Sequence, residues 1–213
     1  MQITLQQLIP GYFDQQNSRV SDIWKQDLVL QAGEYVKIVA PSGTGKTSLT
    51  HFLYGLRREY NGNILYDGRN LRSLTAEEIA GYRKDHISIV FQDLRLFADQ
   101  TVAQNIGLKR QLNPFHPPEK IQYMAEALGI GGKLRQRCGQ CSYGEQQRVA
   151  IIRALMQPFE FLLLDEPFSH LDDNNAIKAM QLILQESKAR NAAIVFADLE
   201  RVDHFPFTRL FHL

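Results

Sequence analysis

The sequence predicts an α/β fold in which a mostly parallel β-sheet follows an N-terminal antiparallel β part and is interrupted by an inserted helical lobe. Two continuous apolar runs, at residues 161–164 and 192–197, are typical of parallel strands that are buried on both faces. A glycine-rich turn at residues 40–48 joins another apolar run to a helix. Between residues 94 and 156 the pattern is helical. We therefore expect one domain, with an α/β core at 1–93 and 157–213 and the lobe at 94–156.

The N-terminal part alternates short apolar runs with turns that contain glycine and proline. Residues 3–9 alternate loosely between apolar and polar side chains, and Pro10-Gly11 ends this first expected strand. The polar stretch 14–21 is expected to be a hairpin loop. Further strands are expected at residues 27–30, 35–39 and 62–68, and a helix at residues 49–54.

The remaining elements follow from caps and periodicity. Thr75-Ala-Glu-Glu78 is a capping box, which predicts a helix that begins near Thr75. An apolar run at 86–91 predicts a strand, and helices are expected in the lobe at 101–108, 118–128 and 142–155. The core resumes with a strand at 161–164, a helix at 176–190, a strand at 192–197 and a last edge strand at 209–213.

Composition narrows the possible classes of protein. The chain has 213 residues, of which 44% are hydrophobic and 22% charged, so it can bury a substantial core. Lys and Arg together number 24 against 23 Asp and Glu, and no basic stripe typical of nucleic-acid binding is found. No apolar run approaches the roughly 20 residues that span a bilayer. The first residues, Met-Gln-Ile-Thr-Leu, do not resemble a signal peptide, so a cytosolic protein is expected.

The two cysteines, Cys138 and Cys141, have C-x-x-C spacing. A zinc site would need two further ligands, and the sequence has no second C-x-x-C or nearby His pair. We therefore expect two unpaired thiols.

Residues 40–48, Ala-Pro-Ser-Gly-Thr-Gly-Lys-Thr-Ser, form a pattern typical of a phosphate-binding loop (P-loop), which favours a P-loop NTPase core. Glycines allow several backbone N–H groups to point into one concavity, and the helix N-terminus adds partial positive charge. Lys46 could reach the β- and γ-phosphates, and Thr47 could bind Mg²⁺. Ala40 replaces the usual first glycine, so Gly43 and Gly45 must supply the turn; an ordinary glycine turn is the alternative. The predicted phosphate-loop residues are Pro41, Ser42, Gly43, Thr44, Gly45, Lys46, Thr47 and Ser48.

Asp165 and Glu166 directly follow the apolar run at 161–164, at the end of a strand where ligands bind in open α/β sheets. Asp165 could hold Mg²⁺, and Glu166 could deprotonate an attacking water. The alternative is an acidic pair that caps the next turn. Gln92 ends another strand and could touch Mg²⁺ or water through its amide, although a strand-end glutamine can equally be a surface residue.

Ser142-Tyr-Gly-Glu145 has two compatible interpretations. Ser142 and Glu145 form a capping box for the helix that follows. The same helix N-terminus could bind an anion, because Gly144 permits close backbone approach.

Together these motifs resemble the nucleotide-binding subunit of ATP-binding-cassette (ABC) transporters over nearly the whole chain. The matched motifs are the Walker A loop at Ala40–Thr47, the Q-loop Gln92, the signature at Cys141–Ala150, Walker B at Leu162–Asp165 with Glu166 as the catalytic glutamate, and the D-loop at Ser169–Asp172. The segment 83–102 looks most like the ATPases of lipoprotein-release, macrolide-export and cell-division systems.

The resemblance implies a head-to-tail homodimer or heterodimer that holds ATP and Mg²⁺ between its subunits. Each ATP would touch Walker A of one chain and Ser142, Gly144 and Glu145 of the other. Lys46, Gln92 and Glu166 would act in catalysis, and Thr47, Gln92 and Asp165 would hold Mg²⁺. The helical lobe and the segment after Gln92 would dock an integral-membrane permease subunit, which places the chain in the cytoplasm at the inner face of the membrane. No nucleic-acid partner is expected.

The chain departs from the family pattern at several positions. Cys141 stands where Leu is usual and Tyr143 where Gly is common. Ala197 stands where the family usually has a His that contacts the γ-phosphate, and His170 or His204 would have to replace it. For stacking on adenine we expect Phe13 rather than Tyr12, with a packed core aromatic as the alternative.

The leading hypothesis is therefore an ATP-hydrolysing subunit that powers a membrane transport or mechanotransmission complex. A second hypothesis, motivated by Ala197, is a nucleotide-gated switch with weak hydrolysis. A third is a soluble ABC protein that acts on nucleic acid or ribosomes, against which the near-neutral charge argues.

Overall fold

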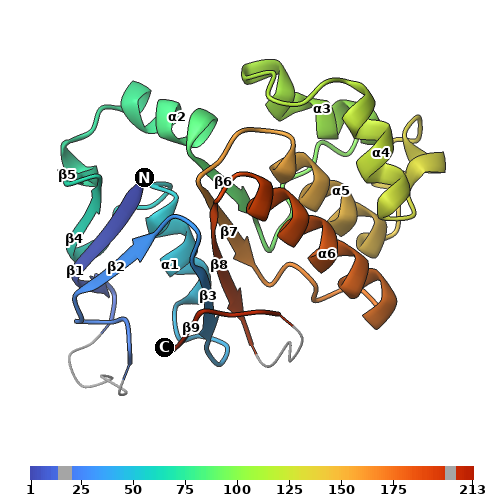
Figure 1. Ribbon diagram of the computed structural model, residues 1–213. Coiled ribbons are helices and arrows are strands. Elements are labelled where there is room, and N and C mark those ends of the chain that lie inside the picture. The colour runs from blue at the N-terminus through green and yellow to red at the C-terminus, as the bar shows by residue number, and fades with distance from the viewer. Residues whose placement is uncertain (14–20, 200–204) are drawn as a thin grey trace.

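The computed structural model describes residues 1–13, 21–199 and 205–213, so residues 14–20 of the predicted hairpin loop and His204 lie outside the described parts. The chain forms a four-stranded antiparallel sheet and a five-stranded parallel sheet, with helices between and beside them (Figure 1). This arrangement confirms the predicted α/β class with its antiparallel N-terminal part.

The antiparallel sheet has the order β2-β1-β4-β5. Its strands are β1 (Gln2–Pro10), β2 (Leu28–Gln31), β4 (Tyr60–Tyr66) and the short β5 (Arg69–Asn70), which was not predicted. The register of the pairing between β1 and β4 shifts at a β-bulge between Gln6 and Ile9. Gly62 sits opposite this bulge with φ 83°, and a Cβ there would lie 2.4 Å from the Gln6 carbonyl oxygen, so the close approach requires glycine.

The parallel sheet has the order β6-β7-β8-β3-β9. Its strands are β3 (Tyr35–Val39), β6 (Ile87–Val90), β7 (Phe161–Asp165), β8 (Ala193–Asp198) and β9 (Arg209–His212). β9 is an edge strand, as predicted, and it lies beside β3. Ala197 pairs with Ile38 on one side and with Asp165 on the other, so the carboxyl ends of β3, β7 and β8 meet at one edge of the sheet.

The predicted helices are formed, but two of them begin earlier than expected, at Lys46 instead of residue 49 and at Asp173 instead of residue 176. They are α1 (Lys46–Leu53), α2 (Ala76–Asp85), α3 (Val102–Leu112), α4 (Glu119–Ala127), α5 (Tyr143–Leu155) and α6 (Asp173–Ala189). Both predicted capping boxes, at Thr75 and Ser142, are formed. Single 3₁₀ turns lie at Leu71–Ser73, Gly131–Lys133 and Cys138–Gln140. Within residues 94–156, all of them described, the structure has helices and one isolated bridge, Thr101 to Arg137, but no strand.

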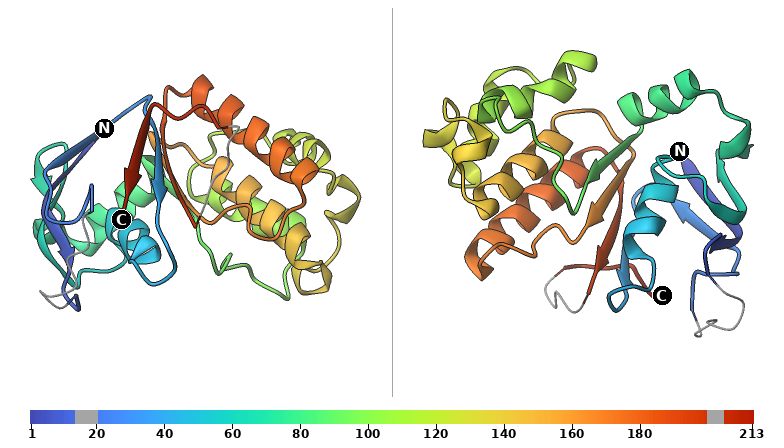
Figure 2. Two further views of the ribbon diagram at one scale, coloured as in Figure 1. Left: turned by 90° about the horizontal axis from the view of Figure 1, so that it is seen from below. Right: turned by 180° about the vertical axis from the view of Figure 1, so that it is seen from behind.

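Two hydrophobic clusters lie on opposite faces of the parallel sheet. One face is covered by α5 and α6, against which α3 and α4 pack, and the other face packs against α1 and the antiparallel sheet (Figures 1 and 2). Strand β7 shows the alternation, because Leu162 and Leu164 belong to the first cluster whereas Phe161 and Leu163 belong to the second. Because both faces of the parallel sheet are packed, the carboxyl ends of β3, β7 and β8 are held in fixed positions relative to one another.

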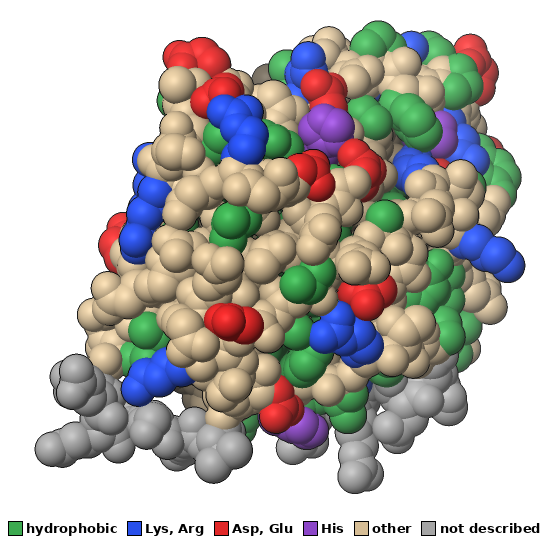
Figure 3. All heavy atoms as spheres, turned by 60° about the vertical axis from the view of Figure 1, so that its left-hand side comes forward, with side chains coloured by type: hydrophobic (Ala, Val, Ile, Leu, Met, Phe, Trp, Pro, Cys, Tyr) green, Lys and Arg blue, Asp and Glu red, His purple; other side chains and the backbone are tan. Residues whose placement is uncertain are grey.

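The surface shows no single-sign stripe on the face drawn in Figure 3, where basic and acidic side chains are interspersed. Among the described residues, no helix combines the length and the apolar character that crossing a membrane requires.

Candidate active site

The phosphate loop leads from β3 into α1 through two glycines with left-handed backbone. Gly43 has φ 82° and Gly45 has φ 98°, so these residues make the turn, as predicted. Ala40 is fully buried, has no positive φ, and donates its N–H to the Asp198 carbonyl oxygen at 3.1 Å. Its backbone therefore does not need glycine, which explains how this departure from the pattern is accommodated.

Aromatic residues from the N-terminal part support the loop from one side. Trp24 donates its indole N–H to the Thr44 carbonyl oxygen at 3.3 Å, and a Cβ at Gly45 would lie 3.1 Å from the Trp24 ring. The Phe13 ring packs edge-on against Trp24 at 6.1 Å. The Tyr12 ring is 54% exposed, and its hydroxyl lies 2.5 Å from the Ser48 hydroxyl. No sequence pattern pointed to Trp24, and the choice of Phe13 over Tyr12 for stacking stays a prediction.

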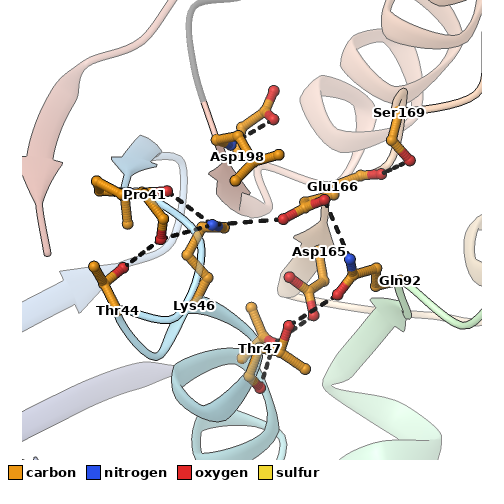
Figure 4. A network of polar contacts seen from close by, with 12 residues as sticks. Pro41, Thr44, Lys46, Thr47, Gln92, Asp165, Glu166, Ser169 and Asp198 are labelled. Atoms are coloured by element: carbon orange, nitrogen blue, oxygen red, sulfur yellow. Dashed lines mark hydrogen bonds and ion pairs between the residues drawn. The ribbon is translucent and has the colours of Figure 1, made fainter.

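Lys46 opens α1 and folds back over the loop (Figure 4). Its ammonium donates to the carbonyl oxygens of Ala40 at 2.7 Å and Pro41 at 3.2 Å, and it lies 3.5 Å from Glu166 Oε1. The side chain is only 5% exposed. The structure therefore places the predicted phosphate ligand beside the predicted catalytic base.

Gln92 connects the two sides of the site. Its amide nitrogen donates to Glu166 Oε2 at 3.2 Å, and its amide oxygen accepts from the Thr47 hydroxyl at 3.1 Å. Gln92, Thr47, Lys46 and Glu166 thus form a chain of polar contacts that runs from α1 to the end of β7 (Figure 4). The predicted residues from three distant parts of the sequence come together at one sheet edge.

Asp165, the last residue of β7, is fully buried beneath this chain of contacts. Its Oδ2 accepts from the Thr50 hydroxyl at 3.3 Å, whereas its Oδ1 has no hydrogen-bond partner. Burial raises the pKa of Asp165 to about 6. A buried carboxylate oxygen without a partner is costly, and a bound cation would compensate it.

Glu166 has a left-handed backbone, with φ 48°, which is rare for a residue with a side chain. Its N–H donates to the Ala197 carbonyl oxygen at 2.9 Å. Ala197 pairs with Asp165, so its methyl group lies on the same face of the sheet as the Asp165 carboxylate. This methyl group is fully buried and offers no polar atom to the site.

The residues predicted to contact a second nucleotide lie at the N-terminus of α5. Ser142 and Glu145 satisfy each other's backbone N–H groups, and Glu145 forms an ion pair with Lys133 at 3.4 Å. Gly144 lies close to the segment after Glu166, because a Cβ there would be 2.8 Å from the His170 carbonyl oxygen. These polar contacts of Ser142 and Glu145 are made within their own helix end and with the neighbouring Lys133.

Tyr143 and His170 meet beside this helix end. Their rings lie 4.3 Å apart in an edge-on arrangement, and the Tyr143 hydroxyl donates to the Gln92 carbonyl oxygen at 3.4 Å. Tyr143 also lines a pocket of about 330 Å³ together with Thr47, His51, Gln92 and Asp93. His170 thus packs on α5 of its own chain.

Cys138 and Cys141 are free and buried. Burial raises the pKa of Cys138 to about 11 and also raises the pKa of Cys141, so both thiols are protonated at neutral pH.

A glycine-turned loop at a helix N-terminus, a buried strand-end aspartate and an adjacent glutamate define a nucleotide-binding P-loop site. A family model described as ABC transporter matches residues 25–169. The lipoprotein-releasing system ATP-binding protein LolD of Syntrophotalea carbinolica is 34% identical over 203 residues, which cover 90% of this chain and 89% of that protein. The chain therefore belongs to the ABC transporter family, as one of its ATP-binding ATPase domains.

A longer relative and a solved structure were also found to be similar to this chain. A probable syringafactin export ATP-binding/permease protein, SyfD, of Pseudomonas syringae is 35% identical over 83% of this chain, but the chain spans only 27% of that protein. The dimeric structure of MJ0796, a bacterial ABC transporter cassette, superposes with a TM-score of 0.78 at 25% identity, covering 93% of this chain and 88% of that one. The fold thus agrees with that of dimeric cassettes, and the relatives include parts of permease-containing proteins.

Proposed function

We propose that this chain is the ATP-hydrolysing subunit that powers a permease-linked ABC complex through nucleotide-driven dimerisation. The observation that carries the proposal is the convergence of Lys46, Thr47, Gln92, Asp165 and Glu166 at one edge of the parallel sheet. The phosphate loop would bind the ATP phosphates through backbone N–H groups, and Lys46 would leave the Ala40 and Pro41 carbonyl oxygens to contact them.

The site fits a magnesium ion. Asp165 has an unpartnered buried oxygen, and Thr47 and Gln92 supply a hydroxyl and an amide oxygen that already lie 3.1 Å apart. Oxygen ligands of this kind suit Mg²⁺, so Thr47, Gln92 and Asp165 would hold it, directly or through water. When bound, the ion would offset negative charge on the phosphates.

Glu166 would act as the general base. In the free chain its carboxylate is held by Lys46 and Gln92. When Lys46 turns to the phosphates and Gln92 to the ion, the Glu166 carboxylate is freed to accept a proton from the attacking water. The resting contacts thus keep the base occupied until nucleotide arrives.

The second half of the nucleotide site would come from another subunit. Ser142, Gly144 and Glu145 lie at a helix N-terminus whose cap is already formed, and such an end favours an anion. The partner would be a second copy of this chain or a related cassette. Residues 94–156 would act as a lobe that docks the permease, at the cytoplasmic face of the membrane, and Phe13 would stack on adenine.

The test is ATP hydrolysis by Glu166→Gln. Positioned general bases contribute about 10²- to 10⁴-fold, so we expect at least a 100-fold fall in kcat with ATP binding retained. Glu77→Gln, at an exposed position on α2, is the matched control and should hydrolyse ATP like the wild type. Equal turnover by the wild type and Glu166→Gln would show that Glu166 is not the base.

A second candidate function is a nucleotide-gated switch that hydrolyses ATP slowly. The observation in its favour is the fully buried Ala197 methyl group on the site's face of the sheet, where the family pattern has a histidine. Ala197→His discriminates the two functions. The switch requires slow wild-type turnover and a gain of about tenfold on introducing the imidazole. Brisk wild-type turnover without a gain favours the hydrolysing subunit, provided that thermal unfolding shows the variant to be folded.

A further inference from the structure

The backbone of Glu166 is held at both of its ends. Its N–H donates to Ala197 on β8 at 2.9 Å. Its carbonyl oxygen accepts from the Ser169 hydroxyl at 3.1 Å and from the Gln147 side-chain amide at 3.2 Å. Because the left-handed conformation of Glu166 is unfavourable by itself, these contacts decide where the carboxylate points.

Gln147 belongs to α5 and is only 2% exposed. Besides the Glu166 carbonyl oxygen, its amide nitrogen reaches the Ser169 hydroxyl at 3.4 Å, and its amide oxygen accepts from the His170 N–H at 3.1 Å. One buried side chain thus satisfies backbone groups at the beginning and at the end of the segment 166–170. Buried amides bonded in this way specify a single local geometry.

The first turn of α5 adds two contacts to the same segment. The Tyr143 ring lies edge-on against the His170 ring at 4.3 Å, and Gly144 lets the helix backbone approach the His170 carbonyl oxygen. Residues 143, 144 and 147 share one side of the helix, since residues three and four apart are neighbours. The helix end that carries Ser142 and Glu145 and the segment that carries Glu166 are therefore packed as one unit.

We propose that Gln147 is a positioning residue that makes the orientation of Glu166 follow the position of α5. The inference rests on the proposed function, in which a nucleotide bound by a partner subunit contacts the N-terminus of α5. Nucleotide binding at the N-terminus of α5 moves or fixes this helix as a rigid element. Through its hydrogen bonds, Gln147 transmits the change in α5 to Glu166, the base of the nucleotide site in the same chain. The two nucleotide sites are thereby coupled within one subunit.

The primary experiment compares Gln147→Met with Gln157→Met. Gln157 is the matched control, because it is also buried and its amide also donates to backbone carbonyl oxygens, those of Arg83 and Ile87, at the other end of α5. Methionine keeps the length of the side chain and removes its hydrogen bonds. We expect both variants to lose similar stability, and only Gln147→Met to lower kcat at least tenfold, with the ATP affinity of the isolated chain changed less than twofold and the Hill coefficient reduced toward 1. Equal kcat values for the two variants would overturn the proposal.

Hydrogen exchange of the nucleotide-free protein gives a readout that does not depend on hydrolysis. In Gln147→Met the His170 N–H loses its acceptor. The backbone N–H groups of Glu166, Phe168, Ser169 and His170 should therefore exchange at least tenfold faster, whereas Gln157→Met should leave them unchanged. Unchanged protection in Gln147→Met would overturn the inference. If Gln147→Met does not fold, Gln147→Glu keeps the acceptor for His170 and loses the donor to Glu166, and the same fall in kcat is expected. A wild-type chain that neither binds nor hydrolyses ATP would refute the proposed function instead.

Discussion

Two buried groups of charged residues lie on opposite faces of the parallel sheet, and they are satisfied to different degrees. On the face of α6, Glu186 is 4% exposed and its carboxylate contacts Arg190 at 2.7 Å, Lys120 at 3.0 Å and His116 at 3.1 Å. On the face of α1, Asp165 has one oxygen without a partner.

The pKa values of the two carboxylates are shifted in opposite directions. Burial raises the pKa of each, but at Glu186 the contacts with His116, Arg190 and Lys120 outweigh it and lower the pKa to about 2. At Asp165 burial dominates and the pKa is about 6. The Glu186 group therefore stabilises the link between α6 and the beginning of α4, whereas the Asp165 site retains unsatisfied capacity that a ligand can use.

The largest effect on stability is expected for Glu186→Gln. The carboxylate has a pKa of about 2 in the folded chain against 4.5 ordinarily, which corresponds to about 3 kcal/mol of stability at pH 7. Because the folded pKa is depressed, this contribution is fully present above pH 4.5 and is lost as the pH falls toward 2. Urea unfolding should therefore show a deficit of about 3 kcal/mol at pH 7 that shrinks below pH 4.5.

Glu126→Gln, an exposed substitution on α4, is the control and should change the unfolding free energy by less than about 0.5 kcal/mol. A Glu186→Gln deficit that is independent of pH would show that lost packing, and not the charge, stabilises this group.

The features of the fold and of the Asp165 site that depend on residues close together in the sequence could be predicted from the sequence. The phosphate loop and the caps at Thr75 and Ser142 depend on residues a few positions apart, so their geometry could be inferred from spacing. The meeting of Gln92 with Glu166 could be expected because both end strands of one parallel sheet.

Contacts between distant residues could not be predicted in the same way. Glu186 and His116 are 70 positions apart in the sequence. The Trp24 indole donates to the Thr44 carbonyl oxygen, and no sequence motif includes both residues. Gln147 gave a weak signal, since it lies three and four residues before the apolar Ala150 and Ile151 on the buried side of α5. Such positions depend on tertiary packing, which a single sequence does not display.

Asp165→Asn is expected to raise the free energy of unfolding in the absence of Mg²⁺ and nucleotide, by less than Glu186→Gln lowers it. Above pH 6 the wild-type chain must bury an ionised carboxylate with one unpartnered oxygen, and the neutral amide avoids this cost. We expect the variant to be more stable by about 1–2 kcal/mol at pH 8 in urea unfolding, and to hydrolyse ATP poorly because a proposed Mg²⁺ ligand has lost its charge.

The pH dependence distinguishes this explanation from a change in packing. The folded pKa of Asp165 is raised above its ordinary 3.8, so the carboxyl favours folding at low pH and loses that advantage as the pH rises through about 6. The gain of Asp165→Asn over the wild type should therefore appear between pH 4 and 7 and be small below pH 4, while the exposed Asp99→Asn should show no such window. If Asp165→Asn is destabilised at pH 8, then the carboxylate of Asp165 is already satisfied in the free chain, and its contrast with the carboxylate of Glu186 fails.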